Sequence, residues 1–314
     1  MILIDQKYKK KSIKGWFKEN GFFLCLVALP VLQFLIMYVY VNLNSFVMAF
    51  RSYSVDEGWG WAGFDNFNEV FRQFESANLF KHAFNNSLIA FAMMLPFDLV
   101  GVFFSYYIFK KFAAWKLFRN ILFLPQILSA GVLILMFDNF GDTFICVALE
   151  NWFGIETGGT LAKNPEYGFY VMIIYNIFMS FGTAVIMYTN AMSNIDESVL
   201  EASKLDGASD FVEFFKIVLP QIISVFSVFL TIRIASIFVG QYNMYPIYGS
   251  TIAKDNQYTI GFYIFKEIKI AQNGNYSKFP YIATIGFLVT CITAPMVFLT
   301  RYLFKKLDPM ESNK

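Results

Sequence analysis

Six long apolar stretches, each close to the length of a membrane-spanning helix, constrain this 314-residue sequence more than any other feature. A helix needs about 20 apolar residues to cross the hydrocarbon core of a bilayer. Asp98 and Arg233 are the only charged residues inside the stretches. Six such stretches leave too little of the chain to bury them in water, so the sequence predicts an all-α integral membrane protein with about six transmembrane helices. The stretches are Phe22–Val41, Leu88–Phe109, Ile121–Phe137, Gly168–Tyr188, Ile217–Gly240 and Phe279–Thr300.

The composition excludes several other classes of protein. Charged residues make up 15% of the chain and hydrophobic residues 57%, whereas a soluble domain is about 25% charged. A net charge of +2 argues against a nucleic-acid-binding protein. The three cysteines lie far apart and His82 is the single histidine, so no zinc site is expected. We therefore expect neither a metal nor another cofactor in this chain.

The distribution of Lys and Arg indicates how the chain is oriented, because these residues favour the cytoplasmic side of a membrane. With the N-terminus inside, the cytoplasmic segments hold 16 of them and the external loops hold 8. This predicts a multi-pass protein of a bacterial plasma membrane, with both termini in the cytoplasm. The expected organisation is a basic tail over residues 1–20, a six-span domain over 21–304 and a short tail over 305–314.

The basic N-terminal segment is too long, and its following apolar stretch too extended, for a cleaved signal peptide. Within it, Ser12–Asn20 places Ile13, Trp16 and Phe17 among lysines. Two interpretations remain open. The segment forms a short amphipathic helix in the membrane interface, or it is a solvated basic tail.

The most informative loop is 194–220, on the predicted cytoplasmic side. Asp196 is a suitable N-cap for a short helix with helical apolar spacing over Ser198–Leu205, and Gly207 stands where that helix would end. A second helix is expected to begin near Ser209 or Asp210 and to run into the fifth span. The apolar content of the loop predicts docking, either against this bundle or against another protein. The second helix has an apolar stripe made of Phe211, Phe214, Phe215, Val218 and Leu219.

This loop resembles the "EAA" loop of permease subunits in binding-protein-dependent ABC importers. The family pattern is Glu-Ala-Ala, three residues, Gly, nine residues, Ile, one residue, Leu-Pro. The sequence has Glu201-Ala202-Ser203, then Gly207, then Ile217 and Leu219-Pro220, and it meets every spacing. Ser203 in place of the second Ala is the one departure, and it exchanges one small residue for another.

The resemblance covers most of the chain and points to the carbohydrate-type permeases, similar to the larger maltose-permease subunit. Four further segments resemble that subfamily: Gly63–Phe67, Asn85–Ser87, Phe118–Pro125 and Arg301–Lys306. The chain departs from the family at Tyr245–Ser250, where a Thr-Gly-Gly-Gly-Pro stretch is common. The departure leaves the identity of the sugar open.

The resemblance implies a type I ABC importer fold and a division of labour between subunits. A second, homologous permease completes the pathway, two cytoplasmic ATPase subunits bind ATP and Mg²⁺, and an extracytoplasmic binding protein delivers the solute. The short helix would be the coupling helix that contacts an ATPase. The sequence contains no GxxxxGK[ST] phosphate loop, so this chain is expected to be a non-catalytic subunit. The implied coupling residues are Glu201, Ala202, Ser203, Leu205, Asp206 and Gly207.

Polar residues at membrane depth are candidates for the solute site, because a charge there costs about 2.5–3.5 kcal/mol on insertion scales. Asp98 and Arg233 have two open interpretations, a structural ion pair between spans two and five or a lining of the pathway. Helical spacing predicts one face with Asn176, Ser180 and Thr183, and another with Arg233, Ser236 and Gly240. In maltose-type permeases the helices on either side of the EAA loop bind the solute, so the resemblance implies that these six residues contact it.

The sequence therefore predicts a permease subunit of an ATP-driven sugar or oligosaccharide importer that works by alternating access. One alternative keeps the family and changes the solute to phosphate, a peptide or a polyamine. A second is an ATP-independent secondary transporter or channel, for which intramembrane carboxylates or repeats are expected. Only Asp98 is available for that role. An intramembrane enzyme is a third alternative, and it lacks candidate catalytic residues.

Overall fold

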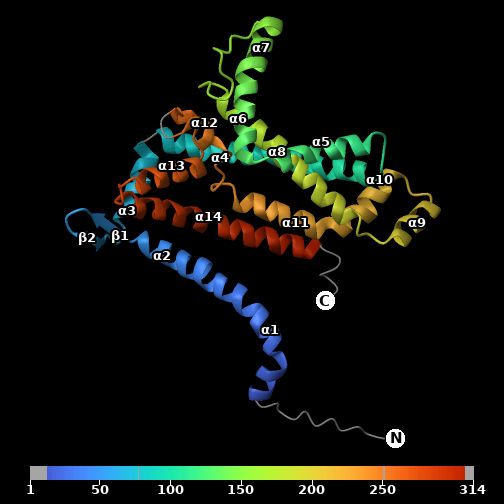
Figure 1. Ribbon diagram of the computed structural model, residues 1–314, viewed down its shortest axis with the longest axis horizontal. Coiled ribbons are helices and arrows are strands. Elements are labelled where there is room, and N and C mark those ends of the chain that lie inside the picture. Colours follow the sequence, from blue (N-terminus) through green and yellow to red (C-terminus); the bar gives the residue numbers. More distant parts are fainter. Residues whose placement is uncertain (1–12, 77, 250–251, 308–314) are drawn as a thin grey trace.

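The computed structural model describes residues 13–76, 78–249 and 252–307 of the chain, and within them the side chains of residues 20–76, 79–249 and 252–306. The fold is a bundle of long helices with one short β-hairpin (Figure 1). The N-terminal part comprises α1 (Ile13–Gln33), the π-helical turn η1 (Phe34–Tyr40), α2 (Val41–Met48), β1 (Arg51–Ser54), β2 (Gly58–Trp61), α3 (Asp65–Ser76) and α4 (Asn78–Phe109). The central part comprises α5 (Trp115–Ile127), α6 (Ala130–Phe140), η2 (Gly141–Ile145), α7 (Cys146–Phe153) and α8 (Gly168–Met192).

The remaining elements contain the loop singled out in the sequence and the last two long helices. They are α9 (Glu197–Leu205), α10 (Asp210–Glu213), η3 (Phe214–Val218), α11 (Leu219–Ala235), α12 (Met244–Tyr248), the 3₁₀ turn η4 (Asp255–Gln257), α13 (Ile260–Gln272) and α14 (Lys278–Leu307). The hairpin is antiparallel, with Arg51 opposite Trp61 and Ser54 opposite Gly58. α14 runs past the domain boundary expected at residue 304, and the rest of the C-terminal tail lies outside the described residues.

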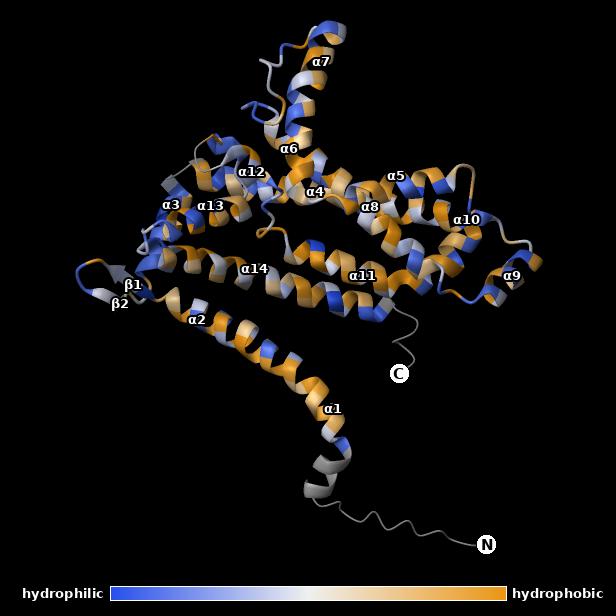
Figure 2. Cartoon of the chain, viewed as in Figure 1, coloured by the Kyte–Doolittle hydropathy of each residue, from blue (hydrophilic) through white to orange (hydrophobic). Residues whose placement is uncertain are grey.

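Six helical segments of the described chain are long and apolar enough to cross a membrane, which confirms the predicted number of spans. Hydrophobic residues predominate along these segments (Figure 2). A membrane solvates such surfaces, whereas water does not. The six segments are Asn20–Met48, Leu79–Phe109, Ala130–Phe153, Gly168–Met192, Asp210–Ala235 and Lys278–Lys306.

The predicted third span, Ile121–Phe137, is wrong. The backbone is extended at Leu128 and Ser129, so α5 and α6 are separate helices. The hydroxyl of Ser129 accepts a hydrogen bond from the amide of Val132 at 3.3 Å and caps the start of α6. The span-length segment is therefore Ala130–Phe153, made of α6, η2 and α7, and it projects away from the other helices (Figure 1).

The first span leaves the bundle along its length (Figure 1) and has no buried residue in its most apolar window. α1 begins at Ile13, so the backbone of the basic segment from Ile13 to Asn20 is helical and continues directly into the span. This agrees with the helical interpretation of that segment. Whether it lies in the membrane interface stays a prediction, and residues 1–12 lie outside the described part of the chain.

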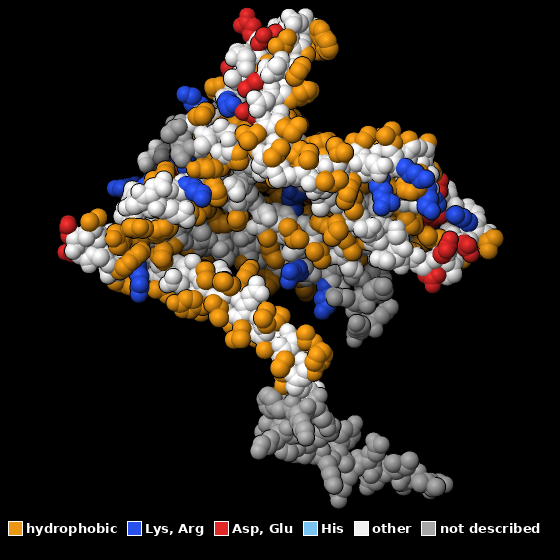
Figure 3. Space-filling model, viewed as in Figure 1, with side chains coloured by type: hydrophobic (Ala, Val, Ile, Leu, Met, Phe, Trp, Pro, Cys, Tyr) orange, Lys and Arg blue, Asp and Glu red, His pale blue; other side chains and the backbone are white. Residues whose placement is uncertain are grey.

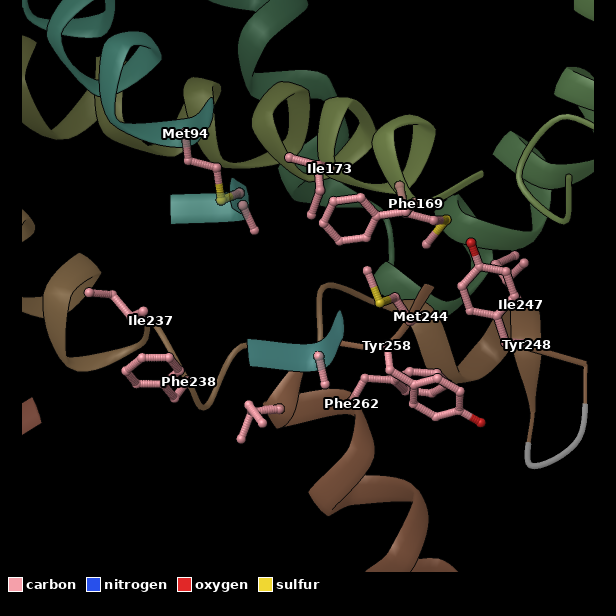
Figure 4. Close-up of a cluster of buried hydrophobic side chains, with 14 of the residues drawn as sticks. Met94, Phe169, Ile173, Ile237, Phe238, Met244, Ile247, Tyr248, Tyr258 and Phe262 are labelled. Carbon is pink, nitrogen blue, oxygen red and sulfur yellow. The ribbon is translucent and has the colours of Figure 1, made fainter. Parts of the chain in front are cut away.

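The core is formed where α4 packs along α8 and where the segment after α11 folds against both. Its largest cluster contains Met94, Ile173, Phe238, Tyr248 and Phe262, which converge from these elements and from α12 and α13 (Figure 4). α5 packs against α8 so closely that a Cβ at Gly182 would lie 2.4 Å from the carbonyl oxygen of Leu122. A glycine is therefore required at that crossing.

Several short elements lie at the two ends of the bundle. α9 and α10 lie at one end, together with the end of α4 and the start of α5, and we call it the α9 end (Figure 1). The hairpin, α3 and α13 lie at the opposite end. The loop over 194–220, expected inside, thus lies at the opposite end of the molecule from the hairpin, α3 and α13, which belong to segments expected outside.

Candidate coupling surface and solute site

The loop over residues 194–220 folds as its local sequence predicts. The carboxylate of Asp196 accepts a hydrogen bond from the amide of Ser198 at 3.0 Å and caps α9. The hydrogen bonds from Ser198 also hold the pKa of Asp196 below its usual value. α10 begins at Asp210, behind the N-cap Ser209, and continues through η3 into α11. The predicted pair of helices is confirmed.

α9 ends in a Schellman motif that depends on Gly207. The amide of Gly207 donates to the carbonyl of Lys204 at 3.1 Å, and the amide of Ala208 donates to that of Ser203 at 3.0 Å. Gly207 has a φ of +76°, which L side chains rarely adopt, and nothing lies within 4 Å of a Cβ built there. The glycine is therefore required by backbone handedness and not by lack of room.

α9 presents most of the predicted coupling residues to solvent. Glu201, Ala202, Asp206 and Gly207 are exposed, and the side chain of Leu205 is 89% exposed. Acidic side chains gather at this end of the molecule (Figure 3). Ser203 differs from the others because it is buried, and its hydroxyl donates to the carbonyl of Leu200 at 2.8 Å. A small residue is needed there for packing.

An open groove of about 830 Å³ lies between α9 and the start of the next helix. It is lined by Val199 and Ala202 on one side and by Val212 and Ile217 on the other, among polar residues. Val199, Leu205, Phe211 and Val212 are exposed apolar side chains of the same loop. A cluster of exposed apolar residues with a polar rim is typical of a protein-docking surface.

A buried ion cluster anchors this loop to the end of α4, and no sequence pattern indicated it. The carboxylate of Glu213 is 2% exposed and lies 2.9 and 3.0 Å from the ammonium of Lys110. Tyr106 donates from its hydroxyl to Glu213 at 3.0 Å, and Lys110 also pairs with Asp210 at 3.1 Å. Burial lowers the pKa of Lys110, but the hydrogen bonds to Glu213 and Asp210 outweigh it and raise that pKa above its ordinary value. Lys110 and Glu213 are 103 residues apart, so no local pattern pairs them.

Arg233 and Asp98 form the ion pair that the sequence left as one of two interpretations. The Arg233 Nε and Nη2 atoms donate to the two carboxylate oxygens of Asp98 at 2.8 and 2.7 Å. Its Nη1 atom lies 3.4 Å from the sulfur of Met94. This bidentate pair joins α4 to α11 at membrane depth, where each charge would otherwise be unpaired.

Asn176 is held by the segment that follows α11. Its side-chain amide donates to the carbonyl of Tyr242 at 2.7 Å and to that of Met172 at 2.8 Å. Its side-chain oxygen accepts a hydrogen bond from the side-chain amide of Asn243 at 3.0 Å. Tyr242 and Asn243 have φ values of 49° and 52°, so Asn176 stabilises two residues in a left-handed conformation. A solute contact of Asn176 stays a prediction.

The other predicted site residues are dispersed. The predicted face of Arg233, Ser236 and Gly240 does not exist, because α11 ends at Ala235 and Ser236 is its C-cap. Gly240 belongs to the non-helical segment, and its carbonyl accepts from the hydroxyl of Thr259 at 3.0 Å. Ser180 donates to the carbonyl of Ile177 in its own helix, and Thr183 is exposed. Within the described chain, no hydrogen bond joins Asn176 to Arg233.

We expect Asn176→Ala to destabilise the protein by about 1–3 kcal/mol, because it leaves the part-buried carbonyl of Tyr242 and side-chain amide of Asn243 without their partner. Thermal unfolding of the purified protein in detergent measures this. Ser180→Ala is the matched control, since its hydroxyl bonds only within α8, and it should unfold like the wild type. The sequence predicts instead that Asn176→Ala weakens solute affinity. Unchanged thermal stability together with a raised KM for uptake would support that role and contradict the structural one.

Comparison with known proteins places these features in a family. A family model described as "binding-protein-dependent transport system inner membrane component" matches residues 88–310. The probable ABC transporter permease protein YesP of Bacillus subtilis is 26% identical over 96% of this chain and 94% of its own length. The polygalacturonan/rhamnogalacturonan transport system permease protein YteP of the same organism is 24% identical over 97% and 94%.

The solved structures show the same fold. A chain of a bacterial alginate ABC transporter, crystallised in complex with alginate pentasaccharide-bound periplasmic protein, superposes with a TM-score of 0.73. The match covers 95% of this chain and 99% of that chain at 18% identity. At this identity the likeness establishes the fold, and the fold is the one that the resemblance of the sequence implied.

Proposed function

This chain belongs to the family of binding-protein-dependent transport system inner membrane components, and on that basis we propose that it is the permease subunit of an ATP-driven importer for a sugar or oligosaccharide. Members of the family are non-catalytic components of transport complexes. The relatives YteP and the arabinooligosaccharides transport system permease protein AraP of Halalkalibacterium halodurans, which is 23% identical over 62% of this chain, support a carbohydrate as the solute. A non-sugar solute is the alternative.

The main support for the coupling role is the exposed surface of α9. Leu205, an apolar residue that is 89% exposed, stands at the end of α9, which is capped at both ends. The next helix, α10, is anchored to α4 by the ion pair of Glu213 with Lys110. We assign α9 as the coupling helix, with Glu201, Leu205 and Asp206 contacting an ATPase subunit. The two ATPase subunits supply the sites for ATP and Mg²⁺, and a second permease and an extracytoplasmic binding protein complete the assembly.

Reconstitution of the complex in liposomes tests the proposal. We expect uptake of a labelled oligosaccharide only when ATP is enclosed with the ATPase subunits and when the binding protein is present on the opposite side. Uptake driven by an ion gradient without ATP would contradict the proposal. ATP-driven uptake of phosphate, a peptide or a polyamine, with none of any sugar, would keep the family and overturn the carbohydrate assignment.

The proposed orientation places α9 and both termini in the cytoplasm. Cysteines introduced at Asn68 and Asn273, which are exposed at the opposite end of the molecule, should then react with an impermeant thiol reagent in intact cells. A cysteine at the exposed Ser209 should react only after the cells are opened. Cys25, Cys146 and Cys291 are first replaced by serine, because two of them are exposed. Labelling of Ser209→Cys in intact cells would reverse the orientation and remove the coupling role.

A further inference from the structure

A second groove, of about 480 Å³, lies at the α9 end between α5 and α8, on the far side of α8 from α11 and its ion pair with Asp98. The walls of the groove come mainly from α5 and α8, and α6, η2 and α7 lie between these two helices in the sequence. It shares no residue with the groove beside α9. The groove is lined by Ile108, Trp115, Lys116, Arg119, Asn120, Leu122, Phe123, Val185, Ile186, Thr189, Asn190 and Ser193.

The two cations of this groove have no acidic partner. Within the described chain, no carboxylate lies within 4 Å of Lys116 or Arg119, and both side chains are exposed. The nearby Lys110 is different, because Asp210 and Glu213 neutralise it. Lys and Arg side chains are conspicuous on the surface over α5 (Figure 3). The groove therefore carries uncompensated positive charge and favours an anion.

Polarity changes along the groove in the same direction on both walls. On α5 it passes from Lys116 and Arg119 to the apolar Leu122 and Phe123. On α8, which runs the opposite way, it passes from Ser193 and Asn190 to the apolar Val185 and Ile186. A small soluble anion needs only the polar part, whereas a ligand with a charged head and an apolar tail matches the whole groove.

The groove also lies at the depth where such ligands are found. The spans formed by α4 and α8 end at Phe109 and Met192, which puts the polar half of the groove at the level of the lipid headgroups and the apolar half within the hydrocarbon. Trp115, beside the cations, is of the residue type that is enriched at this boundary. Basic pockets between transmembrane helices are known to bind anionic headgroups.

We propose that this groove binds an anionic phospholipid. The phosphate lies between Lys116 and Arg119, the polar side chains of Asn120 and Asn190 are placed to hydrogen-bond the headgroup, and an acyl chain follows the apolar walls of α5 and α8. The inference depends on the position of the groove in a membrane protein and on its charge. It does not depend on which solute the protein transports.

Native mass spectrometry of the full chain, purified in detergent and supplied with phosphatidylglycerol or phosphatidylcholine, tests the site. We expect the wild type to retain phosphatidylglycerol in preference to phosphatidylcholine. K116Q/R119Q should lower the apparent affinity for phosphatidylglycerol about 25-fold, since each cation near a membrane surface contributes about fivefold. The control K305Q/K306Q removes two charges at the end of α14, outside the groove, and should retain phosphatidylglycerol like the wild type.

Four results would overturn the proposal. Equal retention of the two lipids would show that the charge of the headgroup does not determine binding. Equal retention of phosphatidylglycerol by K116Q/R119Q and by the wild type would place the lipid elsewhere. Displacement of bound phosphatidylglycerol by millimolar inorganic phosphate would show that the groove binds a free anion. Loss of the lipid on assembly with the second permease would show that a protein occupies the groove. Binding with the expected preference supports the site even if the oligosaccharide proposal fails.

Discussion

Replacing Gly207 by proline is expected to abolish solute uptake while the protein still inserts into the membrane. Proline fixes φ near −65°, whereas Gly207 has a φ of +76°. Proline also removes the amide hydrogen that bonds the carbonyl of Lys204. Both changes dismantle the end of α9, so its docking surface is displaced. Uptake and solute-stimulated ATPase activity of the reconstituted complex measure the loss.

Gly207→Asn is the matched control, because asparagine tolerates the left-handed conformation better than other residues with a side chain, and open space surrounds the position. It should retain most of the uptake. Glu201→Lys tests the surface itself, since Glu201 is exposed and its reversal leaves the fold of α9 unchanged. We expect it to abolish uptake as well. Normal solute-stimulated ATPase activity in either Gly207→Pro or Glu201→Lys would remove the coupling role from this loop.

Arg233→Gln alone is expected to cause the largest loss of stability among single changes in the membrane. It leaves the carboxylate of Asp98 without its bidentate partner, and breaking a buried ion pair on one side costs about 3–5 kcal/mol. The amount of folded protein in the membrane should fall sharply. Fluorescence-detected size exclusion of a tagged chain measures it.

The double change Asp98→Asn with Arg233→Gln separates the two interpretations of this pair. Neither residue then carries a charge, so expression should recover. Because the guanidinium already bonds Asp98 and contacts Met94, we expect uptake to recover as well. Recovery of expression with low uptake would instead show that Arg233 contacts the solute.

Local sequence signals predicted the parts of the structure that are locally determined. Asp196 and Gly207 mark the two ends of α9 because a capping carboxylate and a left-handed glycine act within a few residues. The number of spans follows from hydropathy for a similar reason, since each helix satisfies its own backbone in the bilayer.

The misses arise where distant parts of the chain decide the local structure. The apolar stretch from Ile121 to Phe137 contains no charge, so hydropathy could not locate the break at Ser129. α11 ends at Ala235, and Asn176 of α8 and Thr259, the N-cap of α13, bond the carbonyls of Tyr242 and Gly240 in the segment that follows it. The Lys110–Glu213 anchor is equally invisible in the sequence, because it joins residues that only the packing of α4 against the loop brings together.

The helical path from Asp210 to Ala235 has one more consequence. It begins within the anchored loop and contains Arg233 near its far end, about 30 Å from Glu213 at 1.5 Å per residue. One continuous helical body therefore joins the anchored loop to the Asp98–Arg233 pair. In the proposed complex, if nucleotide state in the ATPase alters the affinity for solute by some factor, the solute must alter nucleotide affinity by the same factor. The nucleotide and solute sites of that complex would share a single coupling free energy, and measuring it at one site would give its value at the other.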